Sequence, residues 1–460
     1  MKRLYRRGGL LGTLFFWGVV IGLGYGIYTL LQSPIFEKNP PEVLLVKERW
    51  WNPARPFEIH LKDESGIKKV TAYLTDGTHT RKIIDKSYTR PPRDLDLNIT
   101  FPKIGLSTKN HLLKLTVKAT DASRWHWLMG NETRAQSILH IDEVKPDLFA
   151  MITSYGITKG GSALAIFKAE DPNLKEVVVK TSFGKDFKPV PFYKKGYYAV
   201  LVAWPLTEKR FRAWIEAEDR AGNRSKTKLS FFLKNRTYRT SYLEAKEKFI
   251  NGKIADLAED HPEKTKNMSP LEKFKFVNET YRGENDALIA KITSRIDGNL
   301  LTSFDITPFY PLKNGKVVGS FGDHRFYYYK EKENIISEAY HLGIDFASVR
   351  QDTLRASNPG VVVFANYNGI YGNCLIIYHG LGLYSLYAHC SSLLVQKGDI
   401  VKRGDIIAKT GATGLALGDH LHFSLLVQGI FVRPAEWMDT QWIKVNIKDV
   451  IDNAIKMINK

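Results

Sequence analysis

Two short clusters of metal-capable side chains lie far apart in this 460-residue chain. The first is His341-Leu-Gly-Ile-Asp345 and the second is His420-Leu-His422. If both segments are β-strands, side chains two or four residues apart point to the same face of a sheet. The histidine and aspartate of the first cluster would then share one face, with Gly343 leaving space between them. We expect the leucine and isoleucine residues of both clusters to point into the core and to anchor the strands.

Nitrogen and oxygen donors that converge in this way are typical of a catalytic zinc site. Three protein ligands leave the fourth tetrahedral position open for water, whereas a structural zinc site is closed by a fourth ligand. The four candidates would supply three ligands and one spare histidine, which could act as a general base or a hydrogen-bond donor. His389, at the end of a predicted strand, could supply a second. Either cluster alone would be weak, because histidines are common on exposed loops.

Glycine-containing segments accompany these clusters: Ser320-Phe-Gly322, Gly369-Ile-Tyr-Gly-Asn373, His379-Gly-Leu-Gly382 and Gly411-Ala-Thr-Gly414. Taken in order, the pattern His-x-x-x-Asp, Tyr-x-His and His-x-His followed by Phe resembles the M23 (LytM or lysostaphin-type) zinc metallopeptidases. The resemblance covers roughly residues 308–439. It implies a β-rich peptidase domain, which we place at residues 301–440.

The resemblance also assigns roles to individual residues. It implies that His341, Asp345 and His422 hold one zinc ion per chain, and that His389 and His420 are the catalytic pair that does not bind metal. One of this pair would take a proton from the attacking water and the other would hydrogen-bond the developing oxyanion. The sequence leaves open which residue does which.

One departure from the family lies upstream of the first cluster. The family usually has Phe-Gly-x-Arg, whereas this chain has Phe321-Gly-Asp-His-Arg325, followed by a charged insertion at residues 330–338. Either Arg325 or His324 could therefore lie near the substrate.

The N-terminus predicts a membrane anchor. Four basic residues precede a stretch that carries no charge from Gly8 to Phe36; they are Lys2, Arg3, Arg6 and Arg7. Its apolar part, about residues 10–31, is long enough to cross a hydrocarbon core of about 30 Å. We therefore assign residues 1–35 to a cytoplasmic basic stub and a single inner-membrane span, with the rest of the chain periplasmic. A cleaved signal peptide is the alternative, but no Ala-x-Ala-like site follows the span.

Composition limits the partners. The net charge of +19 suits attraction to anionic wall polymers or lipid head groups. Nucleic acid is not expected, because the basic surface would lie outside the cytoplasm and no phosphate-loop or zinc-finger spacing occurs. The two cysteines, Cys374 and Cys390, flank a predicted hairpin and could be either bonded or free and buried. The oligomeric state stays open.

Residues 42–235 alternate apolar and polar side chains in short runs, as β-strands do. A weak repeat in which Asp63 corresponds to Asp171, and Asp121 to Asp219, suggests two immunoglobulin-like sandwich domains at residues 42–145 and 146–235. They could space the enzyme from its membrane or bind envelope proteins. Four tryptophans could stack on carbohydrate, or could pack in the sandwich cores or at the interface between the two domains: Trp50, Trp51, Trp125 and Trp127.

Residues 236–300 form a predicted helical connector, with helical composition from Tyr242 to about Arg295. Ser269-Pro-Leu-Glu272 is a capping box, which predicts a helix start. The helices could be a packed connector, or they could lie across the zinc cleft and move before substrate enters. Residues 441–460 form a predicted C-terminal helix whose apolar side is expected to pack on the protein.

The predicted fold is therefore multidomain and mainly β, with an N-terminal transmembrane helix, two sandwich domains, a short helical connector and a C-terminal peptidase domain. The predicted function is a membrane-anchored zinc endopeptidase that cleaves peptide cross-links of bacterial peptidoglycan during wall growth or remodelling. One alternative is a catalytically inactive regulator that binds wall amidases or divisome proteins, although such a module would be expected to lack ligands. Another is a scaffold in which the zinc is structural.

Overall fold

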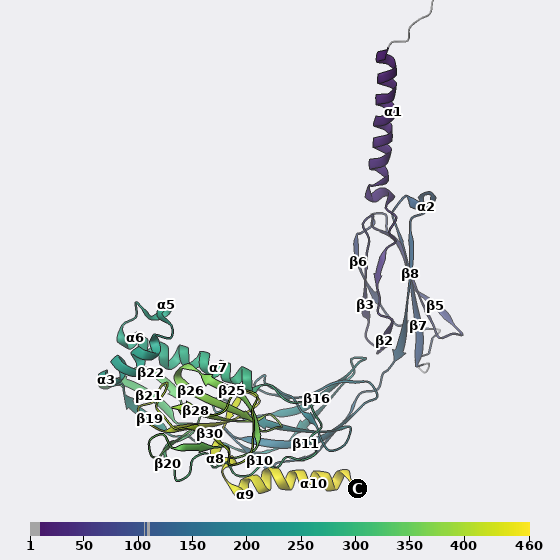
Figure 1. Cartoon of the computed structure of the whole chain (residues 1–460). Coiled ribbons are helices and arrows are strands. Elements are labelled where there is room, and N and C mark those ends of the chain that lie inside the picture. Colours follow the sequence, from purple (N-terminus) through teal and green to yellow (C-terminus); the bar gives the residue numbers. More distant parts are fainter. Residues whose placement is uncertain (1–9, 105, 108–110) are drawn as a thin grey trace, which may run out of the picture. The chain divides into compact units, whose positions relative to one another are not determined.

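The computed structural model describes residues 10–104, 106–107 and 111–460. Its contacts divide the chain into two compact units, Met1–Lys145 with Glu218–Asn223, and Pro146–Ala217 with Arg224–Lys460. Both are mainly β (Figure 1). The basic residues predicted to orient the anchor, Lys2, Arg3, Arg6 and Arg7, lie outside the described residues.

The apolar N-terminal stretch forms one helix, α1 (Leu10–Leu31). A helix of 22 residues is about 33 Å long, which matches the thickness of a hydrocarbon core. Its length and composition suit a membrane span, and a signal sequence would have the same properties.

Two sheets follow α1 in the first unit. One has the order β1 (Glu42–Leu44), β3 (Phe57–Lys62), β6 (Asp94–Ile99), and the other β2 (Glu48–Trp51), β8 (Glu132–Ile141), β7 (Leu112–Asp121), β4 (Ile67–Thr75), β5 (Thr80–Ser87). Buried side chains alternate with more exposed ones along β3, as expected of a strand with one face on the core. Both sheets contribute to one hydrophobic core.

The four tryptophans do not share one environment. Trp51 is 2% exposed and lies in this core, whereas Trp127 is 94% exposed. Trp50 stacks on His140, with 4.7 Å between the ring centroids. Core packing is therefore right for Trp51 and wrong for Trp127.

The second unit begins with another pair of sheets. Their orders are β14 (Val190–Pro191), β15 (Tyr197–Ala203), β11 (Ser162–Glu170), β9 (Asp147–Thr153), and β13 (Asp186–Phe187), β12 (Leu174–Thr181), β16 (Ala213–Asp219), β17 (Arg224–Leu229). The strands β10 (Gly156–Thr158) and β18 (Phe232–Lys234) pair in parallel beside them.

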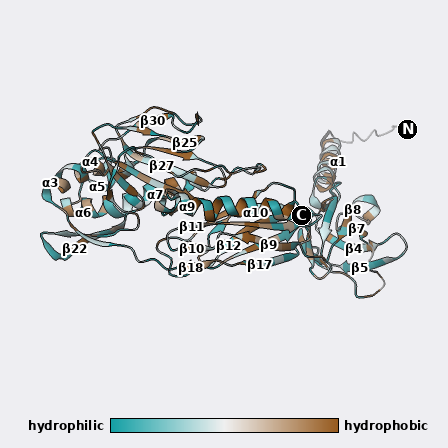
Figure 2. Cartoon of the chain, turned by 90° about the horizontal axis from the view of Figure 1, so that it is seen from below, coloured by the Kyte–Doolittle hydropathy of each residue, from teal (hydrophilic) through white to brown (hydrophobic). Residues whose placement is uncertain are grey.

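The predicted C-terminal helix packs on this pair of sheets. The chain ends in α8 (Pro434–Trp437), α9 (Thr440–Ile443), a π-helical turn at Lys444–Lys448 and α10 (Asp449–Ile458). The helix α10 contacts β9 and β11 and has one apolar and one polar side (Figure 2). Its buried side chains belong to a core that is shared by residues of β11, of β15 and of the predicted peptidase region, residues 301–440. The predicted packing face is confirmed, and residues 146–235 are not separate from the peptidase region.

The peptidase region is built on an eight-stranded sheet. Its order is β20 (Lys316–Gly319), β23 (Ile344–Ala347), β31 (Leu421–Val427), β27 (Leu383–Cys390), β26 (Asn373–Tyr378), β25 (Gly360–Tyr367), β29 (Ile400–Val401), with β32 (Ile430–Val432) beside β31. Every residue of β27 and β31 is buried, so both faces of the central sheet are covered. A smaller sheet has the order β24 (Thr353–Arg355), β30 (Ile406–Lys409), β28 (Ser392–Leu393).

The predicted hairpin that carries the cysteines is confirmed, since β26 and β27 pair antiparallel. Cys374 and Cys390 are free and buried. Burial raises the pKa of Cys390 to about 12 and also raises the pKa of Cys374. Both thiols are therefore protonated at neutral pH and pack as small apolar groups.

The helical segment is shorter than predicted. Thr240–Glu244, which includes Tyr242, forms β19 and pairs in parallel with β21 (His324–Tyr329), which in turn pairs with β22 (Glu331–Tyr340). The helices follow: α3 (Glu247–Phe249), a π-helical turn at Ile250–Ile254, α4 (Ala255–Ala258), α5 (Pro262–Thr265), α6 (Pro270–Lys275), a π-helical turn at Phe276–Tyr281 and α7 (Arg282–Thr293). The capping box at Ser269 is confirmed, with both reciprocal hydrogen bonds present.

These helices share a core with the eight-stranded sheet. Their buried residues Ile254, Phe274 and Val277 belong to one cluster with Ile376 and Leu386 of β26 and β27. They therefore cover one face of the sheet and are part of the fold of the peptidase region.

We predict that Ile447→Ala destabilises the second unit. Ile447 is fully buried in the shared core, and removing such a side chain costs about 2–5 kcal/mol of unfolding free energy. Met457→Ala is the matched control, since Met457 is 43% exposed and should change stability by less than about 0.5 kcal/mol. Urea unfolding followed by intrinsic fluorescence checks the prediction, and equal midpoints for the two variants would contradict it.

Candidate metal centre and cleft

The two clusters meet at neighbouring strands. Asp345 on β23 pairs directly with His422 on β31. His341 lies between β22 and β23, so the prediction that the whole first cluster is one strand is wrong for residues 341–343. Leu421 is fully buried, as predicted, whereas Leu342 is half-buried and lines a cleft beside the metal-capable residues.

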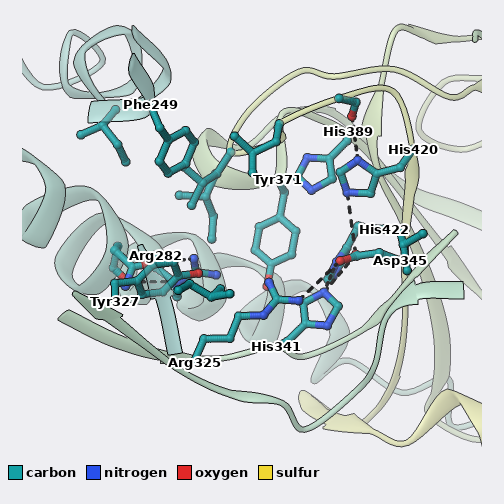
Figure 3. Close-up of a pocket in the computed structure, with 18 of the residues that line it drawn as sticks. Phe249, Arg282, Arg325, Tyr327, His341, Asp345, Tyr371, His389, His420 and His422 are labelled. Carbon is teal, nitrogen blue, oxygen red and sulfur yellow. Dashed lines mark hydrogen bonds and ion pairs between the residues drawn. The ribbon is translucent and has the colours of Figure 1, made fainter. Parts of the chain in front are cut away.

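Three donor atoms converge at this point (Figure 3). Asp345 Oδ1 lies 2.9 Å from His341 Nε2 and 2.9 Å from His422 Nδ1, and the two nitrogens are 3.1 Å apart. Ligands held at about 2.0–2.2 Å from a tetrahedral zinc ion would be about 3.3–3.6 Å apart. The three atoms are thus close to the separation that a shared ion requires.

Hydrogen bonds on the outer sides of both rings fix their tautomers. His341 Nδ1 lies 2.8 Å from the Ser320 carbonyl, which can only accept, so Nδ1 carries the hydrogen and Nε2 is a lone pair. Ser424 Oγ donates to the Leu342 carbonyl at 2.9 Å and accepts from His422 Nε2 at 3.0 Å, so His422 Nδ1 is a lone pair too. Two lone pairs and a carboxylate oxygen therefore face one another, and such a set fits a cation.

His422 does not carry a second proton that could replace the cation. Burial lowers the pKa of His422 to about 4, so the ring is neutral at pH 7. The guanidinium of Arg325, with Nη2 3.7 Å from Asp345 Oδ2, favours the ionised carboxylate. The carboxylate is therefore ionised and lacks a counter-charge from these rings.

Gly343 provides the space that its position in the motif suggested. A Cβ atom built on Gly343 would lie 2.5 Å from His422 Nε2 and 2.6 Å from Ser424 Oγ. Any side chain there would displace the ring that presents the metal-facing nitrogen, so glycine is required by contact.

His389 and His420 lie next to the three converging atoms, with 4.8 Å between their ring centroids. His389 Nδ1 donates to the Thr413 carbonyl and His420 Nδ1 donates to the Gly418 carbonyl, each at 2.8 Å. Both Nε2 atoms are therefore acceptors, and that of His420 lies 3.8 Å from Asp345 Oδ1.

The backbone of His389 is unusual. Its φ of 63° is in the left-handed region, which costs a non-glycine residue free energy and is frequent at functional sites. Burial, together with the neighbouring rings of His420 and His422, lowers the pKa of His389, so its ring is neutral at pH 7.

Of the two substrate-side candidates, the structure places Arg325 in the cleft and His324 outside it. Residues alternate along β21, so Arg325 faces the cleft while His324 stacks on Tyr340 at 4.2 Å and approaches Glu338 Oε2 at 3.0 Å. Arg325 Nε donates to Asp323 at 3.2 Å, and its Nη2 lies 3.7 Å from Asp345 Oδ2.

The cleft has a volume of about 710 Å³. One side is formed by the histidines and Asp345, and the other by β19 and the helices, which contribute Leu243, Phe249, Ile254, Phe274 and Arg282 (Figure 3). Sequence reasoning raised helices across the zinc cleft as one possibility. It did not identify these residues, because nothing local links them to the histidines. It also missed Ser424, although the alternation that pairs His420 with His422 puts Ser424 on the same face.

Comparisons with known proteins identify a family for the segment that contains these residues. Residues 339–434 match the sequence model of Peptidase family M23. The DD-carboxypeptidase/endopeptidase Mpg of Neisseria meningitidis is 39% identical over 94 residues, which are 20% of this chain and 22% of that protein. The peptidoglycan DD-endopeptidase ShyA of Vibrio cholerae is 41% identical over 91 residues, 20% of this chain and 21% of that protein.

The chain thus spans about a fifth of the length of the curated relatives it matches. A crystal structure of a peptidase M23 from Pseudomonas aeruginosa is 20% identical and covers 62% of this chain and 95% of its own, with a TM-score of 0.36. Residues 339–434, the segment that matches the family model, contain all three converging donors and both further histidines of the cleft. The C-terminal part of this chain, residues 339–434, is therefore a Peptidase family M23 domain.

Proposed function

We propose that this protein is a zinc-dependent endopeptidase that cuts peptide cross-links of bacterial peptidoglycan. The observation that carries the proposal is the meeting of His341, Asp345 and His422 as three acceptors without a proton, beside two more histidines with free Nε2 atoms. The substrate class is supported by the relatives of the matched domain, which are named as peptidoglycan DD-endopeptidases.

His341, Asp345 and His422 would hold one zinc ion. When bound, zinc would polarise the scissile carbonyl and make water acidic near pH 7. His420 Nε2, the acceptor 3.8 Å from Asp345 Oδ1, would take the proton of the attacking water. The ring then becomes a donor and can return that proton to the leaving amine. The deeply buried His389 would hydrogen-bond the reacting groups from the other side.

Two features of the site disfavour the other functions considered. An inactive regulator of this family would be expected to lack ligands, whereas every expected polar position here is filled and converges. A structural zinc would require a fourth protein ligand, and among the described residues the metal-capable group at this point comprises only His341, Asp345 and His422.

The rest of the chain would hold the cleft near the bacterial cell wall. We propose that residues 1–35 are retained as an inner-membrane anchor, and that residues 42–145 act as an immunoglobulin-like spacer or partner-binding domain in the periplasm. Residues 146–235 share a core with the eight-stranded sheet, so they would support the peptidase region and could bind envelope partners. The helices of residues 236–300 would form the wall that contacts the substrate peptide, together with Arg325. Arg325 also approaches the second oxygen of Asp345 and so positions that ligand.

We predict that alanine variants separate the ligands from the catalytic pair. His341→Ala and His422→Ala should lose bound zinc, whereas His389→Ala and His420→Ala should keep it and lose about 10²–10⁴-fold in turnover. Zinc analysis by mass spectrometry and release of cross-linked wall peptides measure the two effects. Unchanged zinc stoichiometry in His422→Ala would contradict the ligand assignment.

We predict that Ser424→Ala weakens zinc binding about 10- to 100-fold, because the hydroxyl fixes the His422 tautomer. Ser385→Ala is the matched control. Ser385 on β27 is also buried, and its Oγ lies 2.7 Å from a histidine nitrogen, His379 Nε2. His379 is not one of the proposed zinc ligands. Competition with a fluorescent zinc chelator gives the affinities. Equal affinities in the two variants would show that the outer hydrogen bond has no role.

We predict that Phe249→Ala lowers kcat/KM about 3- to 10-fold through KM, because contact with an aromatic ring is worth about 1 kcal/mol. Leu288→Ala is the control, since Leu288 is 40% exposed on α7 and outside the cleft lining. Steady-state kinetics on a cross-linked muropeptide, with zinc content checked, gives both constants. A faster Phe249→Ala enzyme would instead mean that the helices must move aside before substrate enters.

A further inference from the structure

Three carboxylates meet where the segment after α1 reaches the first pair of sheets. Glu37 follows the short 3-10 turn at Pro34–Phe36, Asp63 lies in the loop after β3, and Asp121 ends β7. One oxygen from each lies within 4.8 Å of an oxygen from each of the others. Asp121 is 0% exposed, Asp63 is 7% exposed, and both carboxylate oxygens of Glu37 are buried.

Hydrogen bonds satisfy the two aspartates only in part. Asp63 Oδ1 accepts from the backbone nitrogens of residues 65 and 66 at 2.9 and 2.8 Å. Asp121 accepts from the backbone of Ser123 at 3.0 Å, and from the backbone and the side-chain amide of Asn131 at 2.8 and 2.7 Å. All of these donors are neutral, so the negative charges are not balanced.

Glu37 has no such donors. Neither of its carboxylate oxygens has a hydrogen-bond partner, and the Oδ1 atom of Asn131, a side chain that is 3% exposed, has none either. Among the residues that the structure describes, no lysine, arginine or histidine forms an ion pair with the three carboxylates. Burying carboxylates without hydrogen bonds or a counter-charge costs several kcal/mol each.

We propose that Glu37, Asp63 and Asp121 bind a calcium ion that fastens the segment after α1 to the first pair of sheets. All the available donors are oxygens, which suit a hard cation, and imidazole or thiolate ligands typical of zinc are absent from the cluster. Calcium accepts six to eight oxygen ligands in flexible geometry, whereas magnesium demands near-ideal octahedral geometry and usually keeps several waters.

An ion at this position would hold the segment after α1 against the first pair of sheets. The Glu37 carbonyl already accepts from Ser123 Oγ at 2.7 Å, the Ile35 carbonyl accepts from the Arg124 nitrogen at 2.6 Å, and Lys38 Nζ lies 4.7 Å from the centre of the Trp125 ring. The segment is therefore docked through its backbone. An ion shared by Glu37 and the two aspartates would lock it there and fix how the chain leaves α1.

A proton is the competing way to relieve the repulsion. Burial and the neighbouring Asp63 and Asp121 raise the pKa of Glu37 to about 7, so a metal-free protein would carry a partly protonated Glu37. A proton neutralises one charge, whereas calcium neutralises two and also coordinates the unpartnered oxygens. If the cluster binds calcium, added calcium should stabilise the protein. If a proton alone relieves the repulsion, added calcium should have no effect at this site.

The test uses the full-length protein in detergent, freed of metal and reloaded with one equivalent of zinc. Calcium and magnesium are titrated calorimetrically into wild type, Glu37→Gln and the control Glu42→Gln, which alters an exposed carboxylate on the nearby β1. We expect wild type and control to bind calcium with a dissociation constant between about 10⁻⁶ and 10⁻³ M. Glu37→Gln should bind one calcium ion fewer per chain than wild type, or bind that ion at least tenfold more weakly.

Thermal unfolding and trypsin cleavage at the exposed Lys38 provide independent readouts. Calcium should raise the unfolding midpoint and slow cleavage in wild type and Glu42→Gln, and do neither in Glu37→Gln. Without calcium, Glu37→Gln should be at least as stable as wild type, because it removes one of three like charges, and this shows that it folds. Three results would overturn the proposal: no calcium uptake by wild type, equal calcium affinity in Glu37→Gln, or tighter binding of magnesium than of calcium.

Discussion

The peptidase site depends on three hydrogen-bond acceptors held together without a hydrogen between them. Two imidazole lone pairs and a carboxylate oxygen lie 2.9–3.1 Å apart in a buried position. Outer partners keep the rings in this state, because the Ser320 carbonyl and the Ser424 hydroxyl occupy their other nitrogens. Three features maintain this arrangement. They are the register of β23 against β31, the absence of a side chain at Gly343 and the burial of both faces of the sheet. A cation of suitable size converts the repulsion into binding energy.

The cleft around these atoms is assembled from parts of the chain that are distant in sequence. The sheet and its adjoining loops contribute the proposed ligands and the two further histidines. The helices contribute an apolar wall through a core that they share with the sheet. Two of the proposed ligands, Asp345 and His422, are fixed by paired strands. Much of the opposite wall of the cleft lies on short helices interrupted by π-helical turns, which are frequent at functional sites.

Short-range patterns in the sequence predicted much of this, and long-range packing accounts for what they missed. The spacing of the histidines and Asp345, the β26–β27 hairpin, the capping box and the apolar side of the C-terminal helix all depend on residues a few positions apart. Tyr242 was wrongly assigned to a helix, because β19 has five residues and its partner β21 lies some eighty residues later. Likewise, alternation suggested a strand at His341, whereas the chain leaves the sheet there to bring Nε2 toward Asp345. The core shared by residues 146–235 and the peptidase sheet has no local signature either.

That shared core has a consequence for how the protein is made. The helix α10 closes against β9 and β11, almost three hundred residues earlier in the chain. Synthesis proceeds from the N-terminus, so β9 and β11 emerge long before α10, and their apolar surface stays uncovered until that helix has been made. The eight-stranded sheet contributes residues to the same core, so its packing is also incomplete until α10 has been synthesised.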